Sequence, residues 1–219
     1  APTGEYRLAG FASGPARAIT RNDKVSQMWP YQDKHPETAL ALQTCDLPDE
    51  AFAQNVADAC GIDPAGVYLL AATTGSLVGC VQICARTPEV SMWGLGFKGF
   101  DVGKVVACTG YAPVPPCTRD ELRAMDRVNT SCLYGGVISY LVDCEDADLT
   151  GLADKLVFAN TRHFGRRFAD LYEEAGRDIF QMDSEVHKVA EITINNLKTG
   201  TTVSAGRRDL HMLKDSFYR

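Results

Sequence analysis

The chain has 219 residues, 45% of them hydrophobic, and a formal net charge of −6. This length can bury a sizeable core. The acidic balance, without a dense basic patch, argues against nucleic acid or an anionic membrane as the main partner. No apolar run approaches the ~20 residues needed to cross a bilayer. We therefore expect a cytoplasmic globular protein with a small-molecule ligand.

Eight cysteines occur without a CxxC pair, a pattern that disfavours a zinc or redox centre of that type. Cys80 and Cys84 are one helical turn apart, and small buried thiols explain this spacing more often than metal ligands do. The four histidines are scattered without ligand spacing. The sequence thus predicts no metal and a protein of the reducing cytoplasm.

Apolar patterns predict strands that alternate with helices, which is typical of an α/β fold. Strands are expected at residues 5–11, 38–44, 67–72, 104–108 and 137–142, and a β-hairpin at 191–196 and 201–205. Helices are expected at residues 46–60, 119–128, 149–158 and 164–175. No linker or repeat marks an internal boundary, so residues 1–219 are treated as one α/β region.

Two further segments are predicted to be irregular. Glycines at residues 94–99 formally match a dinucleotide-binding pattern, but they end a helix and precede a strand, so they predict a helix stop and a loop. The proline-rich residues 111–116 are expected to line or cover another part of the molecule.

The stretch TTGSLVGCVQICARTPE, residues 73–89, follows a predicted strand and opens a helix. Thr74 and Ser76 supply hydroxyls where free backbone N–H groups cluster. Arg86 and Glu89 are spaced i,i+3, which places them on one helical face. Such a pair is either a solvated ion pair or a carboxylate held by a guanidinium beside a cleft, able to take a proton from water. Spacing alone does not separate the two.

Two glycine-bearing turns are further candidates for ligand contact. Ser13 and Gly14 begin a turn in which backbone N–H groups and Arg17 would hold an anion or an electron-rich ring edge, unless the turn only connects two elements. Tyr134 and Gly135 precede a second glycine and a strand. Paired glycines let a ligand approach the backbone, or simply form a bend.

Three blocks together resemble one family. ASGPARA, the 73–89 block with its Gln82, Arg86 and Glu89, and LYGGVISYLV are similar to the methenyltetrahydromethanopterin cyclohydrolases of methanogenic, sulfate-reducing and methylotrophic one-carbon metabolism. The ending ITINNLKTGTTVSAG also fits. The resemblance implies a family-specific α/β fold with mixed sheets flanked by helices, a cytoplasmic homotrimer, no metal and no prosthetic group.

The resemblance also implies reversible hydrolysis of the cyclic amidinium of N5,N10-methenyltetrahydromethanopterin, or a close analogue, to the N5-formyl form. Glu89 would take the proton of the attacking water, and Arg86 would hold the carboxylate and the water in line. The pterin and its tail would bind to Ser13, Gly14, Arg17, Thr74, Ser76, Gln82, Tyr134 and Gly135.

Two departures from the family accompany the resemblance. Pro88 separates the two catalytic candidates, and a proline kinks or restarts a helix. The sequence also resembles about the C-terminal two thirds of the family chain, so we expect a second polypeptide with the N-terminal portion, in a trimeric assembly. The alternative function is a catalytically silent pterin-binding or scaffold subunit of a one-carbon complex.

Overall fold

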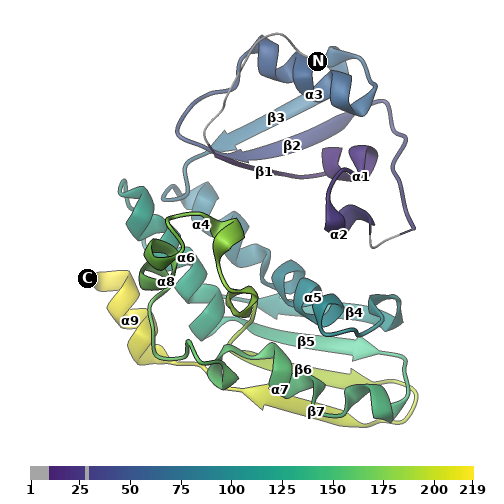
Figure 1. The fold of residues 1–219 in the computed structure, drawn as a ribbon, viewed down its shortest axis with the longest axis vertical. Coiled ribbons are helices and arrows are strands. Elements are labelled where there is room, and N and C mark those ends of the chain that lie inside the picture. The colour runs from purple at the N-terminus through teal and green to yellow at the C-terminus, as the bar shows by residue number, and fades with distance from the viewer. Residues whose placement is uncertain (1–9, 28–29) are drawn as a thin grey trace. The chain divides into compact units, whose positions relative to one another are not determined.

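Two mixed β-sheets, each packed against helices, organise the protein in the computed structural model (Figure 1). The structure describes residues 10–27 and 30–219. The chain forms two compact units, Ala1–Thr74 and Gly75–Arg219. No feature of the sequence marks the boundary between them. The predicted α/β class with mixed sheets is confirmed.

The first unit contains a three-stranded sheet in the order β1-β2-β3. Its elements are β1 (Phe11–Ser13), α1 (Ala16–Thr20), α2 (Lys24–Gln27), β2 (Thr38–Gln43), α3 (Glu50–Cys60) and β3 (Val67–Ala72). β1 runs antiparallel to β2, whereas β2 and β3 are parallel, and α3 forms the crossover that a parallel pair requires. The strands predicted at residues 38–44 and 67–72 are confirmed; residues 5–9 of the first predicted strand lie outside the described residues.

Local sequence sets both ends of α3. The side chain of Asp49 accepts a hydrogen bond from the Phe52 N–H, and Gly61 ends the helix in the left-handed region at φ 68°. The apolar side of α3 packs on Leu40 and Leu42 of the sheet. Tyr68 and Leu70 of β3 alternate with the core-facing residues and are exposed, at 54% and 59%. One face of this sheet is therefore apolar and exposed.

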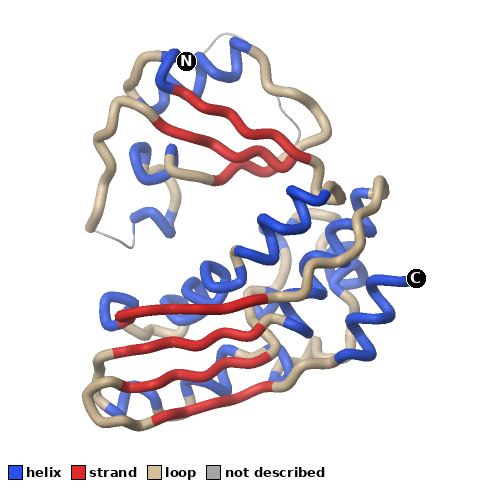
Figure 2. The backbone as a smooth tube through the Cα atoms, turned by 180° about the vertical axis from the view of Figure 1, so that it is seen from behind, coloured by secondary structure: helices blue, strands red, loops and turns tan. Residues whose placement is uncertain are grey.

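The second unit contains a four-stranded sheet in the order β4-β5-β6-β7, whose strands lie side by side in Figure 2. The strands are β4 (Val105–Tyr111), β5 (Val137–Val142), β6 (Glu191–Asn196) and β7 (Thr202–Gly206). β5 and β6 are parallel, and the two edge strands are antiparallel to their neighbours. The hairpin predicted near the C-terminus is confirmed as β6 and β7.

The helices of this unit are α4 (Leu77–Ala85), α5 (Thr87–Phe97), α6 (Glu121–Gly135), α7 (Leu152–Leu156), α8 (Phe168–Glu174) and α9 (Leu210–Tyr218). Helices α5 and α7 pack on the sheet, while α6 packs against α4, α8 and α9 (Figure 1). The main core is formed by buried residues that include Leu95, Ile138, Tyr140, Leu156, Ile192 and Ile194. None of the helices in the described part of the chain is long and apolar enough to cross a bilayer.

Several predicted element boundaries are wrong where tertiary packing decides them. α6 extends to Gly135, and α9 was not predicted; these two helices pack on each other. The predicted helix at residues 149–158 is interrupted, because Gly151 adopts φ 63° between a 3₁₀ turn and α7. The helix predicted at 164–175 begins only at Phe168.

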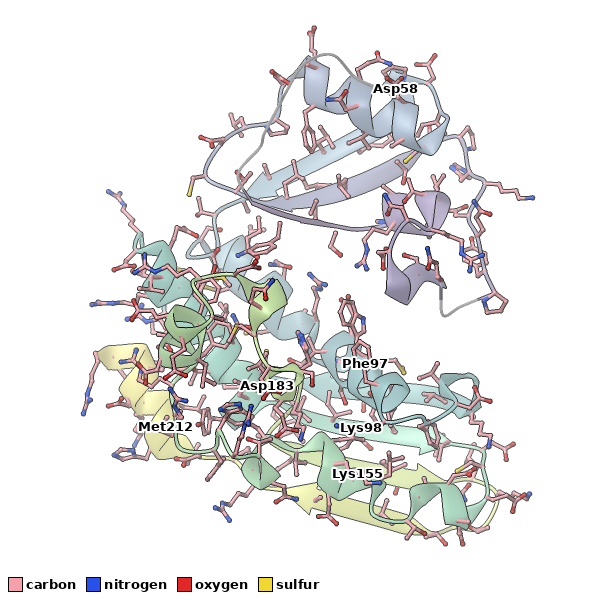
Figure 3. The ribbon with its side chains drawn as sticks, viewed as in Figure 1. Asp58, Phe97, Lys98, Lys155, Asp183 and Met212 are labelled. Atoms are coloured by element: carbon pink, nitrogen blue, oxygen red, sulfur yellow. The ribbon has the colours of Figure 1, made fainter. Side chains whose placement is uncertain are left out.

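The glycine-rich residues 94–99 are also partly mispredicted. Gly94 to Phe97 form the last turn of α5, and the labelled Phe97 and Lys98 mark its end in Figure 3. A Cβ on Gly94 would lie 3.2 Å from Leu156 Cδ2, so the glycine lets α5 approach α7. Gly99, at φ 81°, then stops the helix.

A buried carboxylate joins three helices of the second unit. Asp126 on α6 is fully buried; Arg167 donates to it at 2.5 Å, Ser216 at 2.7 Å and the Ala169 N–H at 2.9 Å. These donors lie at the start of α8 and on α9, so one side chain ties α6 to both. Hydrogen bonding to Asp126 raises the pKa of Arg167.

We predict that Asp126→Ala lowers the free energy of unfolding by about 3 kcal/mol, because it leaves a largely buried guanidinium and a hydroxyl without their acceptor. Chemical denaturation with circular dichroism measures this loss. The control is Asp148→Ala, which removes a partly exposed carboxylate paired with Lys104 and should leave the transition midpoint nearly unchanged. Equal effects of the two changes would show that the buried network does not stabilise the unit.

Candidate active site

Arg86 and Glu89 form a two-pronged ion pair. Arg86 Nε donates to Glu89 Oε2 at 2.5 Å, and Nη2 donates to Oε1 at 2.8 Å. This planar fork fixes the orientation of both groups, which a single-point contact would not do. The side chains remain 40% and 38% exposed, so water reaches the carboxylate. The pair predicted from the sequence therefore forms.

The backbone places the pair at a junction between two helices. α4 ends at Ala85 and α5 begins at Thr87, with Arg86 between them at φ −85° and ψ 4°. The Val90 N–H donates to the Arg86 carbonyl at 3.1 Å as the first hydrogen bond of α5. Pro88 lies in the first turn of α5, where its missing N–H costs nothing within that helix. The proline thus restarts the helix, and the i,i+3 pair forms between the boundary residue and the first turn of α5 rather than within one continuous helix.

This geometry leaves Glu89 able to act on water. It lies in the first turn of α5, where the helix dipole stabilises a negative charge. Each carboxylate oxygen accepts one hydrogen bond from Arg86 and has further acceptor capacity. An oriented, half-exposed carboxylate of this kind can hold a water molecule and take its proton.

Two other candidates lie on α4. Ser76 is its N-cap and accepts a hydrogen bond from the Gly79 N–H at 3.0 Å. Gln82 is half-buried and lies in the last two turns of α4, four residues before Arg86. The capping role of Ser76 accounts for its position. Gln82 is closer in sequence to the Glu89 carboxylate than Ser76 is.

Tyr134 is a core residue of the second unit. Its side chain is fully buried, its ring packs edge-on to Phe158 with centroids 5.2 Å apart, and burial raises its pKa to about 12. The hydroxyl donates to the Arg166 carbonyl at 2.6 Å and accepts from the Gly165 N–H at 2.9 Å. These contacts give Tyr134 a packing role, and they do not test its predicted contact with substrate.

Gly135 ends α6 against the proline-rich segment. A Cβ there would lie 2.8 Å from Pro113 Cδ and 3.1 Å from Leu213 Cδ1. The close approach that a glycine allows is thus made by the protein's own chain. The irregular segment predicted at residues 111–116 packs on α6, where Ser131 donates to the Pro113 carbonyl.

The remaining candidates belong to the first unit. Ser13, Gly14 and Arg17 lie together at the end of β1, where Arg17 Nη1 donates to Ser13 Oγ at 3.2 Å and the Arg17 N–H donates to the Gly14 carbonyl at 3.0 Å. Arg17 also holds Asp23 through two further bonds, which keep the pKa of that carboxyl well below its usual range. Thr74 is buried and accepts a hydrogen bond from Gln43 at 2.7 Å.

No group of three or more histidine, cysteine, aspartate or glutamate side chains in the described residues is arranged to hold a metal ion. All eight cysteines are free thiols, and Cys80 and Cys84 are buried, as expected for small core residues. Desolvation raises the pKa of Cys84.

A family model described as Cyclohydrolase (MCH) matches residues 4–217. The chain belongs to the methenyltetrahydromethanopterin cyclohydrolase family. Relatives of that name include proteins from Methanococcus maripaludis strain C5, 37% identical over 216 residues, and Methylobacterium sp. strain 4-46, 33% identical over 214 residues. A third, from Methanothermobacter marburgensis, is 35% identical over 210 residues. The family resemblance predicted from the sequence is confirmed.

These alignments cover 97%, 98% and 94% of this chain, respectively, and 66% of each relative. The chain thus spans about two thirds of the length of the curated cyclohydrolases it matches. The similarity extends through both units, and so the family assignment applies to all of the candidate residues.

We predict that Tyr134→Phe lowers the free energy of unfolding by about 1–3 kcal/mol, because the change leaves the Gly165 N–H and the Arg166 carbonyl unpaired. Thermal denaturation measures this effect. Substrate affinity, measured by equilibrium binding, should stay the same if the hydroxyl only packs the core. A variant of unchanged stability that binds substrate more weakly would instead support direct contact with the ligand.

Proposed function

We propose that this chain provides the catalytic pair of a cyclohydrolase that converts N5,N10-methenyltetrahydromethanopterin, or a close analogue, to the N5-formyl form. The two-pronged pair of Arg86 and Glu89 carries this proposal, and the names of the relatives supply the substrate. The pterin is the substrate, and the reaction as proposed needs no prosthetic group.

In the proposed reaction, water adds to the positively charged carbon that bridges two nitrogens of the substrate. Glu89 removes a proton from this water as the new C–O bond forms. The carboxyl group then passes this proton to N10 as the C–N10 bond breaks. The adduct's hydroxyl loses its own proton to solvent and becomes the C=O of the formyl group on N5. The net reaction thus consumes one water and releases one proton, and in the reverse direction Glu89 takes the N10 proton.

Arg86 is proposed to position Glu89 rather than to exchange protons. Its planar fork donates to both carboxylate oxygens. An oriented base and water reach the geometry of attack at a smaller entropic cost.

The pterin ring and tail are proposed to contact Ser13, Gly14, Arg17, Thr74, Ser76, Gln82, Tyr134 and Gly135, as the family resemblance implies. Gln82 has the firmest support among these, because it is half-buried and one helical turn before Arg86. Ser76, Tyr134 and Gly135 also have structural roles in the fold. We propose that these three residues contact the ligand through their backbone groups.

We also propose that the active species is a cytoplasmic trimer in which a second polypeptide covers the exposed sheet face of the first unit. The apolar, exposed face of the first unit's sheet supports this. Tyr68 and Leu70 there are large exposed side chains on an edge strand, and exposed apolar edges are normally covered in soluble proteins.

Substitution of Glu89 tests the proposed chemistry. Glu89→Gln should abolish hydrolysis and leave substrate binding largely intact, because the amide keeps the shape of the side chain and loses the base. Loss of the methenyl absorbance reports hydrolysis. Arg86→Lys should also be slow, since an ammonium lacks the fork.

The matched control is Glu173→Gln, which breaks an exposed Arg–Glu pair on α8 and should leave turnover unchanged. Near-normal turnover of Glu89→Gln would remove this carboxylate from the mechanism. That result would favour the alternative function, a catalytically silent pterin-binding subunit.

The proposed assembly predicts that residues 1–219 expressed alone are inactive. They should gain activity when the third of the family sequence that they do not match is supplied as a separate polypeptide. Light scattering gives the mass of each species, and the methenyl absorbance gives its rate. The complemented species should have the mass of three pairs. A fully active species that contains only residues 1–219 would contradict this proposal.

A further inference from the structure

The two residues between Arg86 and Glu89 are anchored in the core, although the pair itself is partly exposed. Thr87 is fully buried, and its hydroxyl donates to the Cys84 carbonyl at 2.7 Å. The same oxygen lies 3.5 Å from Cys132 Sγ on α6. Burial raises the pKa of Cys132 to about 12, so its thiol keeps the hydrogen that it can share with Thr87.

The hydroxyl of Thr87 replaces a missing backbone donor. In a continuous α-helix the Cys84 carbonyl would accept a hydrogen bond from the N–H of the residue four positions later. That residue is Pro88, which has no N–H. Thr87 supplies a hydrogen in its place and joins the Arg86 N–H as a donor to this carbonyl where the helix breaks.

Two glycines make room for this anchor. A Cβ on Gly136 would lie 3.0 Å from Thr87 Cγ2 and 2.5 Å from the Cys132 carbonyl oxygen. A Cβ on Gly110 of β4 would lie 2.3 Å from Ile138 Cδ1 and 3.4 Å from Pro88 Cγ. The junction is thus seated against β4 and the end of α6.

We propose that Thr87 is a positioning residue that sets the mutual orientation of Arg86 and Glu89 by fixing the break between α4 and α5. This inference rests on the proposed function of that pair. Arg86 directly precedes Thr87, and Glu89 follows it by two residues. Loss of the hydroxyl leaves Cys84 O without this bond and frees the junction to rotate the carboxylate away from the attacking water.

The test measures hydrolysis of methenyltetrahydromethanopterin. The protein assayed is this chain alone, if it is active, or otherwise this chain together with the separate polypeptide described above. Thr87→Val keeps the shape and removes the hydroxyl, and we expect kcat to fall about 10- to 100-fold with KM nearly unchanged. Thr87→Ser restores the hydroxyl and should recover most of kcat. If Thr87→Val does not fold, Thr87→Ala removes the same donor without adding an apolar group.

The control is Thr130→Val, the same change at another fully buried threonine of this unit, whose hydroxyl bonds Asp126 at 3.4 Å. It should lower the melting temperature and leave kcat unchanged. A similar fall in kcat for Thr130→Val would show that any loosening of the core slows the enzyme and would overturn the positioning role.

A double-mutant cycle separates this inference from the proposed function. In an Arg86→Ala background, Thr87→Val should change the remaining rate less than about twofold, since the orientation that Thr87 protects is already lost. An equal fall in both backgrounds contradicts the inference. Normal turnover of Glu89→Gln contradicts the proposed function, whereas an inactive Glu89→Gln beside a fully active Thr87→Val contradicts only the role of Thr87.

Discussion

One side-chain hydrogen bond spans the break between α4 and α5. The proposed orientation of the catalytic pair depends on the geometry of that break. Pro88 cannot donate to the last turn of α4, and the Thr87 hydroxyl donates instead to the Cys84 carbonyl. This bond adds a second donor, beside the Arg86 N–H, to a carbonyl at the end of α4, and a hydrogen bond of this kind contributes about 0.5–1.5 kcal/mol. The bond allows a helix to stop, place one residue outside both helices and restart within the core.

The position of Arg86 explains how an exposed ion pair can have a defined geometry. Exposed pairs contribute little to stability, partly because two long side chains must be ordered to form them. Here Arg86 is the boundary residue of both helices and Glu89 lies in the first turn of α5, so both backbones are already fixed. The remaining side-chain freedom is limited by the two-pronged contact. The carboxylate is thereby oriented yet accessible to water.

The seat of the junction combines segments that are distant in the chain. Gly110 comes from an edge strand, Gly136 from the residue that follows α6, and Cys132 from the last turns of that helix. Helix α6 is in turn held to α8 and α9 through Asp126. The junction that bears Arg86 and Glu89 is thus linked through α6 to α8 and α9.

Sequence patterns predicted the parts of the structure that local interactions decide. Gly61 correctly marked the C-terminal end of α3, whereas the helix begins at Glu50, after its N-cap Asp49, and not at residue 46 as predicted. Strands β2, β3 and β5 and the β6–β7 hairpin were readable because alternating or continuous apolar residues need only a sheet to cover them. The i,i+3 spacing brought Arg86 and Glu89 forward as a pair.

By itself, the sequence determined the α/β class, the family and the identity of the paired charges, because each depends on residue types at fixed short spacings. Tertiary structure alone decided that Tyr134 lies in the core, that α6 runs to Gly135 and that Thr87 anchors the pair. A threonine before a proline is an ordinary helix start in sequence. Its proposed role emerges only when residues 132 and 136 meet it in the fold, and such non-local contacts leave no periodic signal in the chain.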